Sequence, residues 1–433
     1  MLNLRLLYTF ALWLLLPYIF LRLLWRSRKQ PEYLHHIGER FGFYSVRSSQ
    51  PVIWLHAVSV GEARAAQSLV TRLRATFPDH QILLTHTTPT GRAASEQLYG
   101  DGVLRVYLPY DYPFAVNRFL RCFRPRLGIL METEIWFNLI RACRKTGMPL
   151  LLLNARMSEN SARSYARFAR LTGEALGGLT AIAAQTADDA ARLSGLGAKN
   201  VSVMGNLKFD IEPPPAMLEL GRQLRAKIGT ARKVFLAAST RDGEEALLLD
   251  ALKQVHIPGL LLLIVPRHPQ RFAEIAAQLD QRGIPFQRRS KIGQAGDSQK
   301  YAVPPKIQVV LGDSMGEMFA YYAAADFAFI GGSLLPYGGQ NLIEACAVGV
   351  PVVIGSHTYN FAEATRLAVQ AGAAVQVPDI AGLIAELHRL FGNPEALSEM
   401  RHRCAGFVES NRGATDKSLL VIVAALRNDR SAK

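Results

Sequence analysis

Residues 52–62, VIWLHAVSVGE, join an uninterrupted apolar run to a turn of small residues that ends on a carboxylate. The run is typical of a strand buried on both faces, as in a parallel sheet that is covered by helices. From Glu62 to Phe77, apolar side chains recur at helical spacing. The turn is therefore predicted to lie at the carboxyl end of a strand, where α/β folds carry their chemistry.

Two interpretations of Glu62 compete at this turn. Ser59 and Glu62 have the S-x-x-E spacing of a capping box, in which the hydroxyl and the carboxylate satisfy amides at a helix start. Alternatively, Glu62 is a catalytic carboxylate at the edge of the sheet. Spacing alone favours the capping box, so the rest of the chain has to decide.

Length and composition narrow the class of protein. A chain of 433 residues predicts two or three domains, and a hydrophobic content of 49% excludes a disordered chain. The formal net charge of +15 favours an anionic partner, such as a membrane surface or a phosphorylated lipid, over a merely solvated basic surface. No polybasic run interleaved with aromatic residues stands out, so nucleic acid is not an expected partner. Four scattered cysteines indicate buried thiols in a reducing cytosol: Cys122, Cys143, Cys346 and Cys404.

The N-terminus carries an uncharged apolar run, residues 6–21, followed by Arg22, Arg26, Arg28 and Lys29. The run is shorter than the roughly 20 residues that cross a bilayer, although Arg22 can snorkel and extend it. An uncleaved anchor and a shallow interfacial helix both fit, whereas a signal peptide fits least, because the positive charge follows the apolar run. By the positive-inside rule, the bulk of the protein is expected to be cytoplasmic, with residues 1–30 as an N-terminal anchoring helix that holds it at the inner face of a membrane.

From residue 51 onward, short apolar runs alternate with amphipathic stretches, which predicts a Rossmann-like domain. A proline run at residues 213–215 breaks the pattern, and a second series of the same kind follows. We therefore expect a first Rossmann-like domain at 31–210 and a second at 211–433. The predicted strands are 52–57, 81–86, 103–107, 127–131, 149–153, 179–184 and 201–204, then 234–238, 260–265, 307–311, 327–331 and 351–354.

For three further stretches of the second half, the sequence predicts only the general kind of structure. Residues 287–305 are expected to form an irregular loop. Residues 394–408 and 416–426 are expected to be amphipathic helices that either cover the second sheet or cross back to the first domain.

Missing motifs exclude several kinds of chemistry. Neither half has G-x-G-x-x-G after its first strand and no P-loop occurs, which argues against hydride transfer and P-loop ATP hydrolysis. No H-E-x-x-H or other metal-ligand spacing occurs. Asp313 and Glu317 suggest metal ligation, but Ser314 and Glu317 fit a second capping box at least as well.

The second half concentrates polar and small residues after its strands. Arg267 follows the run LLLLIV, where an arginine either binds phosphate or forms a salt bridge. Gly338 and Gly339 precede a helix that opens with Asn341, and amides at such a start favour an anion. Glu344 either has a cap-like role or accepts hydrogen bonds from ribose hydroxyls. Together these features predict a nucleotide-phosphate site that faces the loops of the first domain.

Ten motifs, in this order and spacing, carry a resemblance that covers nearly the whole chain: GERFG at 38–42, HAVSVGE, LPYD, METEIW, NAR, GNLKFD, VPRHP, GDSMGE, FIGGS and GGQNLIEA. In these motifs the chain resembles the 3-deoxy-D-manno-octulosonic acid (Kdo) transferases, which build the inner core of lipopolysaccharide. One departure is Phe137, where the family pattern usually has proline, and we expect it to perturb a helix start rather than the chemistry.

The resemblance implies a GT-B glycosyltransferase with two Rossmann-like domains around a cleft. It implies CMP-Kdo as the donor, a lipid A precursor (lipid IVA) as the acceptor, and an inner-membrane location. Glu62 corresponds to the general base, and Glu132 and Lys208 correspond to groups that stabilise the transition state. The CMP-binding segments correspond to Pro266, Arg267, Met315, Gly316, Glu317, Asn341, Leu342, Ile343 and Glu344.

The implied reaction is direct displacement with inversion, for which one positioned base suffices. A donor with one phosphate lacks the diphosphate that typically chelates a metal, so neither a metal nor another cofactor is expected. Glu39 is interpreted as a paired loop charge, with acceptor contact as the alternative, and Glu134 as structural. Two other functions stay open: a GT-B enzyme that transfers from a UDP-sugar to a membrane lipid, and an inactive nucleotide-sugar-binding scaffold. The number of Kdo residues added is not predicted.

Overall fold

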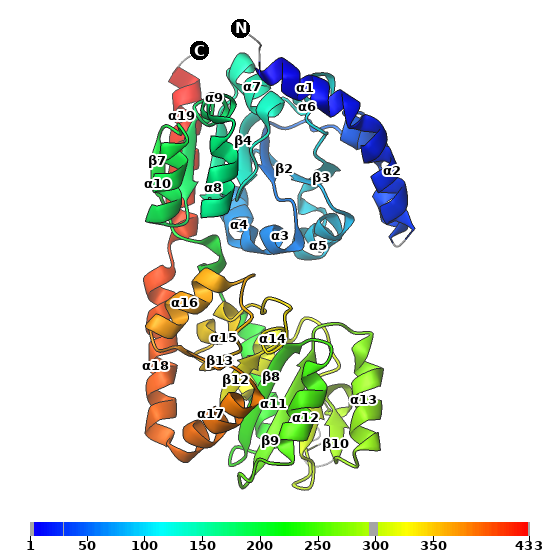
Figure 1. Ribbon diagram of the computed structural model, residues 1–433, viewed down its shortest axis with the longest axis vertical. Coiled ribbons are helices and arrows are strands. Elements are labelled where there is room, and N and C mark those ends of the chain that lie inside the picture. Colours follow the sequence, from blue (N-terminus) through cyan, green and yellow to red (C-terminus); the bar gives the residue numbers. More distant parts are fainter. Residues whose placement is uncertain (1–3, 29, 294–301, 432–433) are drawn as a thin grey trace. The chain divides into compact units, whose positions relative to one another are not determined.

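The computed structural model describes residues 4–28, 30–293 and 302–431. The chain forms two compact units, and each is built on one seven-stranded parallel sheet with helices packed against it (Figure 1). Unit 1 comprises Met1–Asp210 and Asn411–Lys433, and unit 2 comprises Ile211–Ser410. The sequence predicted one domain from 211 to 433, but residues 411–433 belong with the first unit.

The first strand of unit 1 lies in the middle of its sheet, with strand order β3-β2-β1-β4-β5-β6-β7. All five residues of β1 are buried, as the apolar run predicted, because helices cover both faces of the sheet. The strands are β1 (Val52–His56), β2 (Gln81–His86), β3 (Leu104–Tyr107), β4 (Pro125–Met131), β5 (Leu150–Ala155), β6 (Ala181–Ala184) and β7 (Val201–Val203).

From β1 onward the helices of unit 1 follow its strands in a βα alternation, whereas the first two helices precede β1 and the last one comes after unit 2 in the chain. They are α1 (Leu4–Leu14), α2 (Leu16–Ser27), α3 (Val60–Ala65), α4 (Gln67–Thr76), α5 (Pro89–Tyr99), α6 (Pro113–Phe123), α7 (Phe137–Thr146), α8 (Glu159–Ala166), α9 (Ala169–Leu176), α10 (Ala187–Gly195) and α19 (Ala414–Ser431), with short 3-10 turns η1 (Pro31–Leu34), η2 (Ile37–Phe41), η3 (Gly100–Gly102) and η4 (Leu207–Phe209).

Unit 2 repeats the arrangement with strand order β10-β11-β9-β8-β12-β13-β14. Its strands are β8 (Lys233–Thr240), β9 (Leu260–Pro266), β10 (Phe286–Arg288), β11 (Val309–Leu311), β12 (Phe327–Ile330), β13 (Val352–Ile354) and β14 (Ala374–Gln376). Its helices are α11 (Pro215–Ile228), α12 (Glu244–Leu252), α13 (Arg271–Gln281), α14 (Met318–Ala324), α15 (Ile343–Ala347), α16 (Ala362–Gln370), α17 (Ile380–Gly392) and α18 (Pro394–Asn411), with the 3-10 turn η5 (Arg289–Lys291).

The predicted strands are all present, with ends within two residues of those predicted. Two short strands were missed, β10 and β14. The irregular loop predicted at 287–305 is wrong at its start, because β10 pairs there with β11 and η5 follows. Residues 294–301 of that predicted loop lie outside the described residues.

The last helix returns to unit 1, so the second of the two predicted alternatives is correct. The Asp210 carboxylate accepts hydrogen bonds from the amides of Gly413, at 2.7 Å, and of Thr415, at the start of α19. Ile422 of α19 is fully buried in the core beneath the first sheet. This packing explains why residues 411–433 separate from unit 2.

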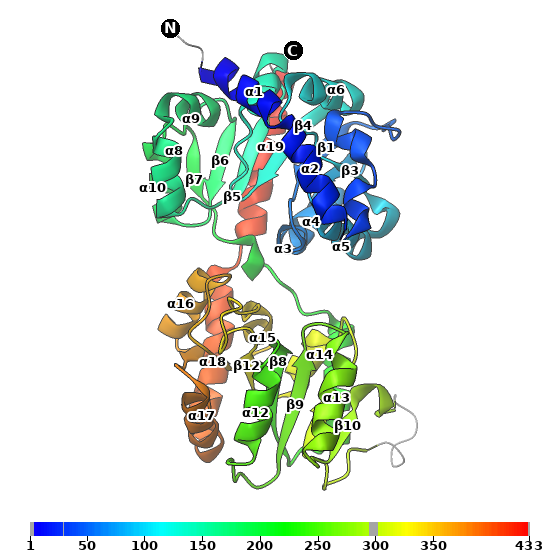
Figure 2. The ribbon, with the colours of Figure 1, turned by 45° about the vertical axis from the view of Figure 1, so that its right-hand side comes forward.

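The apolar N-terminal run forms two helices, α1 and α2, that meet at a bend of 46°, rather than the predicted single helix (Figure 2). Within the described residues no single helix is long and apolar enough to cross a membrane, although this bent pair together has the required length and composition. The Tyr8 hydroxyl donates to Asp111 at 3.0 Å, and the Tyr112 hydroxyl donates to the Leu12 carbonyl at 2.6 Å. Helix α1 is therefore held against unit 1.

Asp111 also organises the start of α7. Its carboxylate accepts the amides of Asn138 and Leu139 at 2.9 and 2.8 Å, so it caps the helix from a distant loop. Phe137 is the first residue of α7. The helix therefore begins at Phe137 with a cap supplied by Asp111, and the effect of phenylalanine in place of proline at this position stays a prediction.

Gly128 in β4 is closely packed, so a substitution there tests how the packing of the first sheet contributes to stability. A Cβ there would lie 2.7 Å from both the Trp54 ring and a Leu150 methyl, so Gly128→Ala should destabilise unit 1 by about 1–3 kcal/mol. All four tryptophans lie in unit 1, so thermal unfolding followed by tryptophan fluorescence reports on this unit.

The control for this test is Gly195→Ala at the end of α10. A Cβ at Gly195 would meet no atom within 4 Å, so the change should leave stability equal or raise it by up to about 1 kcal/mol. Equal melting temperatures for Gly128→Ala and the native protein would contradict this description of the core.

Candidate active site

Two carboxylates of unit 1 lie where the order of its strands reverses. Strands β1 and β4 are neighbours, but β1 leads to β2 on one side and β4 leads to β5 on the other. Crevices form outside the carboxyl ends of such strands, and ligands of α/β proteins bind there. Glu62 lies in the first turn of α3, just after β1, and Glu132 follows β4 directly. The electrostatic repulsion between them is strong enough to affect the titration of Glu62.

Glu62 combines parts of both predicted roles. The Ser59 hydroxyl accepts the Glu62 amide at 3.3 Å, so Ser59 is the N-cap of α3 as the capping box predicted. The Glu62 carboxylate accepts the Val58 amide at 2.8 Å and the Ser59 hydroxyl at 2.9 Å. In a reciprocal capping box the Glu62 carboxylate would accept the Ser59 amide. Here it accepts instead the amide of Val58, the residue before the cap. The carboxylate is thus held rigidly by two donors.

Burial raises the pKa of Glu62 to about 7, because desolvation disfavours the charged carboxylate. Repulsion from Glu132 also raises the pKa of Glu62, while the Val58 amide, the Ser59 hydroxyl and His56 oppose the rise. A carboxylate with a pKa near 7 accepts a proton readily, and about half of it is ionised at pH 7, which suits a general base.

Lys208 lies beside Glu132, with its Nζ 3.7 Å from the Glu132 carboxylate. Glu132 has φ +58°, a left-handed conformation that is uncommon for a residue with a side chain and that clusters at functional sites. The turn that carries Lys208 is held by the side chains of Asn206, which accepts the Lys208 amide at 3.0 Å, and Asn154, which accepts the Leu207 amide at 3.1 Å. The structure therefore brings together all three predicted catalytic residues of unit 1.

The two weaker carboxylates of the sequence have structural contacts. Glu39 is buried and accepts from Arg92 at 2.9 Å and from the Tyr107 amide at 2.7 Å, as expected for a paired charge. Glu134 accepts from the Trp136 ring nitrogen at 2.6 Å. Burial pushes its pKa upward, but His56 and Trp136 outweigh this effect and lower the pKa of Glu134.

Unit 2 has its own reversal of strand order, between β8 and β12. Glu244, at the start of α12 after β8, is fully buried and accepts the amides of Gly332, Ser333 and Leu334 at 2.6, 3.0 and 3.1 Å. It fixes the glycine-containing loop after β12 in place. Sequence reasoning missed Glu244, although its position in an RDGEE turn directly after a buried strand is the kind of signal that identified Glu62.

A basic cluster follows β8 and β9 at the same edge of this sheet. Arg241 lies 3.1 Å from the His268 ring nitrogen and over the Tyr337 ring, and Arg267 donates to Gln340 at 3.2 Å. Burial lowers the pKa of His268, and Arg241, Arg267 and Arg271 lower it further. Arg267 was predicted here, whereas Arg241 was missed. Such a concentration of guanidinium groups is suited to an anion.

The other predicted CMP-binding residues of unit 2 lie in different environments. Pro266 ends β9, and Met315 is exposed beside Gly316. Glu317 accepts the Ser314 hydroxyl at 2.6 Å and lies 3.2 Å from Arg289. Helix α14 begins only at Met318, with Glu317 in the cap position and no side-chain cap, so the predicted capping box from Ser314 to Glu317 is wrong.

Asn341 and Glu344 bond to each other at 3.1 Å, and Asn341 also accepts the Ile343 amide at 3.1 Å. Leu342 and Ile343 are fully buried, so only their backbone could contact a ligand. Helix α15 has only five residues, which limits the dipole that the sequence invoked here. Among the described residues no group of three or more His, Cys, Asp or Glu side chains could hold a metal ion.

Comparison with known proteins gives the family. The family model described as 3-deoxy-D-manno-octulosonic-acid transferase (kdotransferase) matches residues 35–211, and the model for glycosyl transferases group 1 matches residues 296–406. The 3-deoxy-D-manno-octulosonic acid transferase of Bordetella pertussis is 43% identical, with 95% of this chain and 97% of the relative covered. The chain belongs to the Kdo transferase family. The enzyme of the same name from Haemophilus influenzae is 35% identical, with 96% of this chain and 97% of that relative covered.

Solved structures agree with the fold of this Kdo transferase family member. A glycosyltransferase from Rickettsia africae has a TM-score of 0.56 at 14% identity, covering 88% of this chain and 100% of that one. Anabaena HepE in complex with UDP has a TM-score of 0.56 at 13% identity, covering 87% and 100%. The chain is thus a glycosyltransferase with an α/β, GT-B-like fold of two parallel sheets.

The pKa of Glu62 gives a test of the site that is independent of activity. Glu132→Gln removes a repulsive charge, so it should lower the pKa of Glu62 from about 7 toward its ordinary value. The side-chain carboxyl ¹³C shift of Glu62, followed by NMR as a function of pH, measures this change.

Glu159→Gln is the matched control, because Glu159 is an exposed carboxylate of unit 1 on α8. It should leave the Glu62 titration unchanged. If Glu62 titrates near 4.5 in the native protein, or with the same midpoint after Glu132→Gln, the described electrostatics of the site are wrong.

Proposed function

We propose that the protein is an inverting glycosyltransferase that transfers Kdo from CMP-Kdo to a lipid A precursor such as lipid IVA. The observation that carries this proposal is the buried Glu62 carboxylate, with a pKa of about 7, beside Glu132 and Lys208 at the strand reversal of unit 1. Relatives that cover nearly the whole chain are named Kdo transferases, which supports the donor sugar. Transfer of this sugar to a lipid A precursor is the step that lipopolysaccharide core synthesis requires.

In the proposed reaction Glu62 is the general base. The acceptor hydroxyl oxygen bonds to the anomeric carbon of Kdo, and its proton passes to the Glu62 carboxylate. At the same time the bond from that carbon to the phosphate oxygen of CMP breaks, and CMP leaves with the electron pair. Attack opposite the departing phosphate inverts the anomeric centre. The rigid hydrogen bonds from Val58 and Ser59 aim the carboxylate and keep its geometry constant.

Charged groups of both units stabilise the proposed transition state. Glu132 offsets the positive charge that develops on the sugar ring and increases the basicity of Glu62. Lys208, with Arg241 and Arg267 of unit 2, offsets the negative charge on the departing CMP. These groups complete the reaction without a metal or other cofactor.

We also propose that helices α1 and α2 attach the enzyme to the cytoplasmic face of the inner membrane, as a signal-anchor does. Support comes from the large apolar side chains that α1 leaves exposed, among them Leu6, Phe10 and Leu14. Arg22, Arg26 and Arg28 follow in α2 and at its end, where they suit an anionic membrane surface. A lipid acceptor is most accessible to an enzyme that is held at the bilayer.

Glu62→Gln tests the proposed base. Loss of general-base assistance should lower kcat about 10²- to 10⁴-fold, while CMP binding to unit 2 stays unchanged. Turnover of CMP-Kdo with a lipid A precursor measures the first effect, and calorimetric titration with CMP measures the second. Glu96→Gln, which removes an exposed carboxylate of α5, should keep near-native turnover.

The pH profile gives a second readout of the same residue. Because the ionised carboxylate is the active form, kcat/KM of the native enzyme should rise about tenfold per pH unit below a pKa of about 7 and level off above it. Glu62→Gln should remove this rise. A native profile that is flat through pH 7, or a Glu62→Gln enzyme with native turnover, would show that Glu62 only caps α3.

A further inference from the structure

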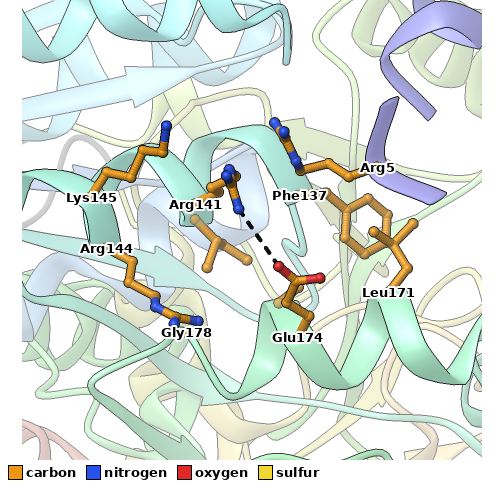
Figure 3. Close-up of a pocket in the computed structure, with 10 residues that line it drawn as sticks. Arg5, Phe137, Arg141, Arg144, Lys145, Leu171, Glu174 and Gly178 are labelled. Atoms are coloured by element: carbon orange, nitrogen blue, oxygen red, sulfur yellow. Dashed lines mark ion pairs between the residues drawn. The ribbon is translucent and has the colours of Figure 1, made fainter. Parts of the chain in front are cut away.

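A pocket of about 250 Å³ lies in unit 1, between α1, α7 and α9 (Figure 3). Helix α7 contributes one face to it, because Ile140, Arg141, Arg144 and Lys145 lie three, four, seven and eight residues after Phe137. Arg5 of α1 closes the pocket from the other side. A single water takes about 30 Å³, so the pocket has room for a polyatomic group.

The pocket carries an excess of positive charge. Four of its lining residues are cationic, and Glu174 is the one carboxylate among the lining residues that the structure describes. Glu174 lies 3.7 Å from Arg141, and Figure 3 shows Arg141 between Arg5 and Glu174. One carboxylate therefore offsets one cation, and Arg144 and Lys145 remain exposed at the rim. The charge selects an anion, while Phe137 and Leu171 supply an apolar wall.

Helix α1 is fixed at this pocket by specific contacts. The Tyr8 and Phe137 rings meet edge to face, with centroids 5.0 Å apart, and the Thr9 hydroxyl lies 3.1–3.2 Å from the Asn138 side chain. The hydrogen bond from the Tyr8 hydroxyl to Asp111 also holds α1 in this place. The pocket is thus built by the same docking that presents the exposed apolar side chains of α1, so a membrane that contacts α1 also lies near the pocket.

The pocket is separate from the proposed active site. Glu62 and Glu132 lie at the carboxyl ends of β1 and β4, before the first turn of α7. Arg144 and Lys145 lie in the last turn of α7, which leads back to the amino end of β5. Gly178, which also lines the pocket, precedes β6. The basic end of the pocket therefore lies toward the opposite edge of the sheet.

We propose that this pocket binds the phosphate of an anionic phospholipid headgroup in the membrane on which the enzyme works. Headgroup phosphates lie at the boundary between water and the acyl chains, where an apolar helix with a neighbouring cation cluster is stabilised. The excess of cations complements the phosphate, and the apolar wall suits the glycerol part of the headgroup. The inference rests on the proposed membrane attachment and adds a specific headgroup site to it.

The test compares the native full-length protein with the double variant Arg144→Gln, Lys145→Gln by co-sedimentation with vesicles. One set of vesicles is phosphatidylcholine alone, and the other contains phosphatidylglycerol as well. The pocket variant should lose about tenfold or more in binding to the phosphatidylglycerol vesicles, since each cation near an anionic surface contributes about fivefold. Its binding to phosphatidylcholine alone should equal that of the native protein, because α1 and α2 are intact.

The double variant Arg222→Gln, Lys253→Gln is the matched control, since it removes the same charge from exposed positions of unit 2. It should change binding to either kind of vesicle by less than about twofold. An equal loss in this control would show a diffuse charge effect and overturn the proposal, as would an unchanged preference for phosphatidylglycerol in the pocket variant.

Two further results separate the remaining alternatives. If the native protein binds neither kind of vesicle, the proposed membrane attachment fails, and this inference fails with it. If it binds phosphatidylcholine and the pocket variant keeps the native preference, only the headgroup site fails. Inorganic phosphate that stabilises the native protein against heat, with no effect of the variant on vesicle binding, would identify a site for free phosphate and overturn the proposal.

Discussion

The polarity of the parallel sheet is the constraint on which the rest of this structure depends. All strands of a sheet point the same way, so the loops that follow the strands all lie at one edge. Where the strand order reverses, the loops after two neighbouring strands diverge and leave a crevice between them. In unit 1 this places Glu62 and Glu132 at one site. In unit 2 it places the Arg241 and Arg267 turns beside the loop that Glu244 holds. Charged side chains far apart in sequence become neighbours because the strands before them are parallel.

Glu62 shows how one residue can serve both structure and chemistry. Its amide is capped by Ser59, and its carboxylate returns to the Val58 amide and the Ser59 hydroxyl. Hydrogen bonds of this kind favour the ionised form, yet the pKa is still raised, because desolvation and repulsion from Glu132 outweigh them. The capping contacts therefore hold the carboxylate without fixing it in the charged state. The spacing presents capping and catalysis as alternatives for Glu62, but in this geometry one carboxylate can serve both roles.

Most of the fold follows from local sequence signals, because continuous apolar runs identify strands that are buried on both faces. Strands β10 and β14 have only three residues each, and neither forms such a run. The return of α19 depends on Asp210 and on burial beneath a sheet formed 200 residues earlier, which no local pattern encodes. The capping box at Ser314 failed because its carboxylate bonds the serine hydroxyl and Arg289 while the helix begins later.

The site was predictable in a different way. Local patterns singled out Glu62 and Arg267, and resemblance to a family added Glu132 and Lys208, but local reasoning could not show that Glu132 repels Glu62 or lies beside Lys208. Arg241 was missed because its role depends on contacts with loops that follow other strands, whereas Glu244 was missed although its turn directly after a buried strand carries a local signal. Phe137 drew attention only as a departure from the family pattern. The structure gives it a physical role, as the ring that docks α1 and lines a basic pocket.

Product analysis tests the central claim most directly. The purified full-length protein is incubated with a lipid A precursor and, separately, CMP-Kdo or a panel of UDP-sugars, and the lipid products are analysed by mass spectrometry and by NMR of the anomeric centre. We predict a lipid that carries Kdo with inverted configuration, formed from CMP-Kdo alone and lost in Glu62→Gln. Transfer from a UDP-sugar, a retained configuration, or no transfer from CMP-Kdo would contradict the proposed function.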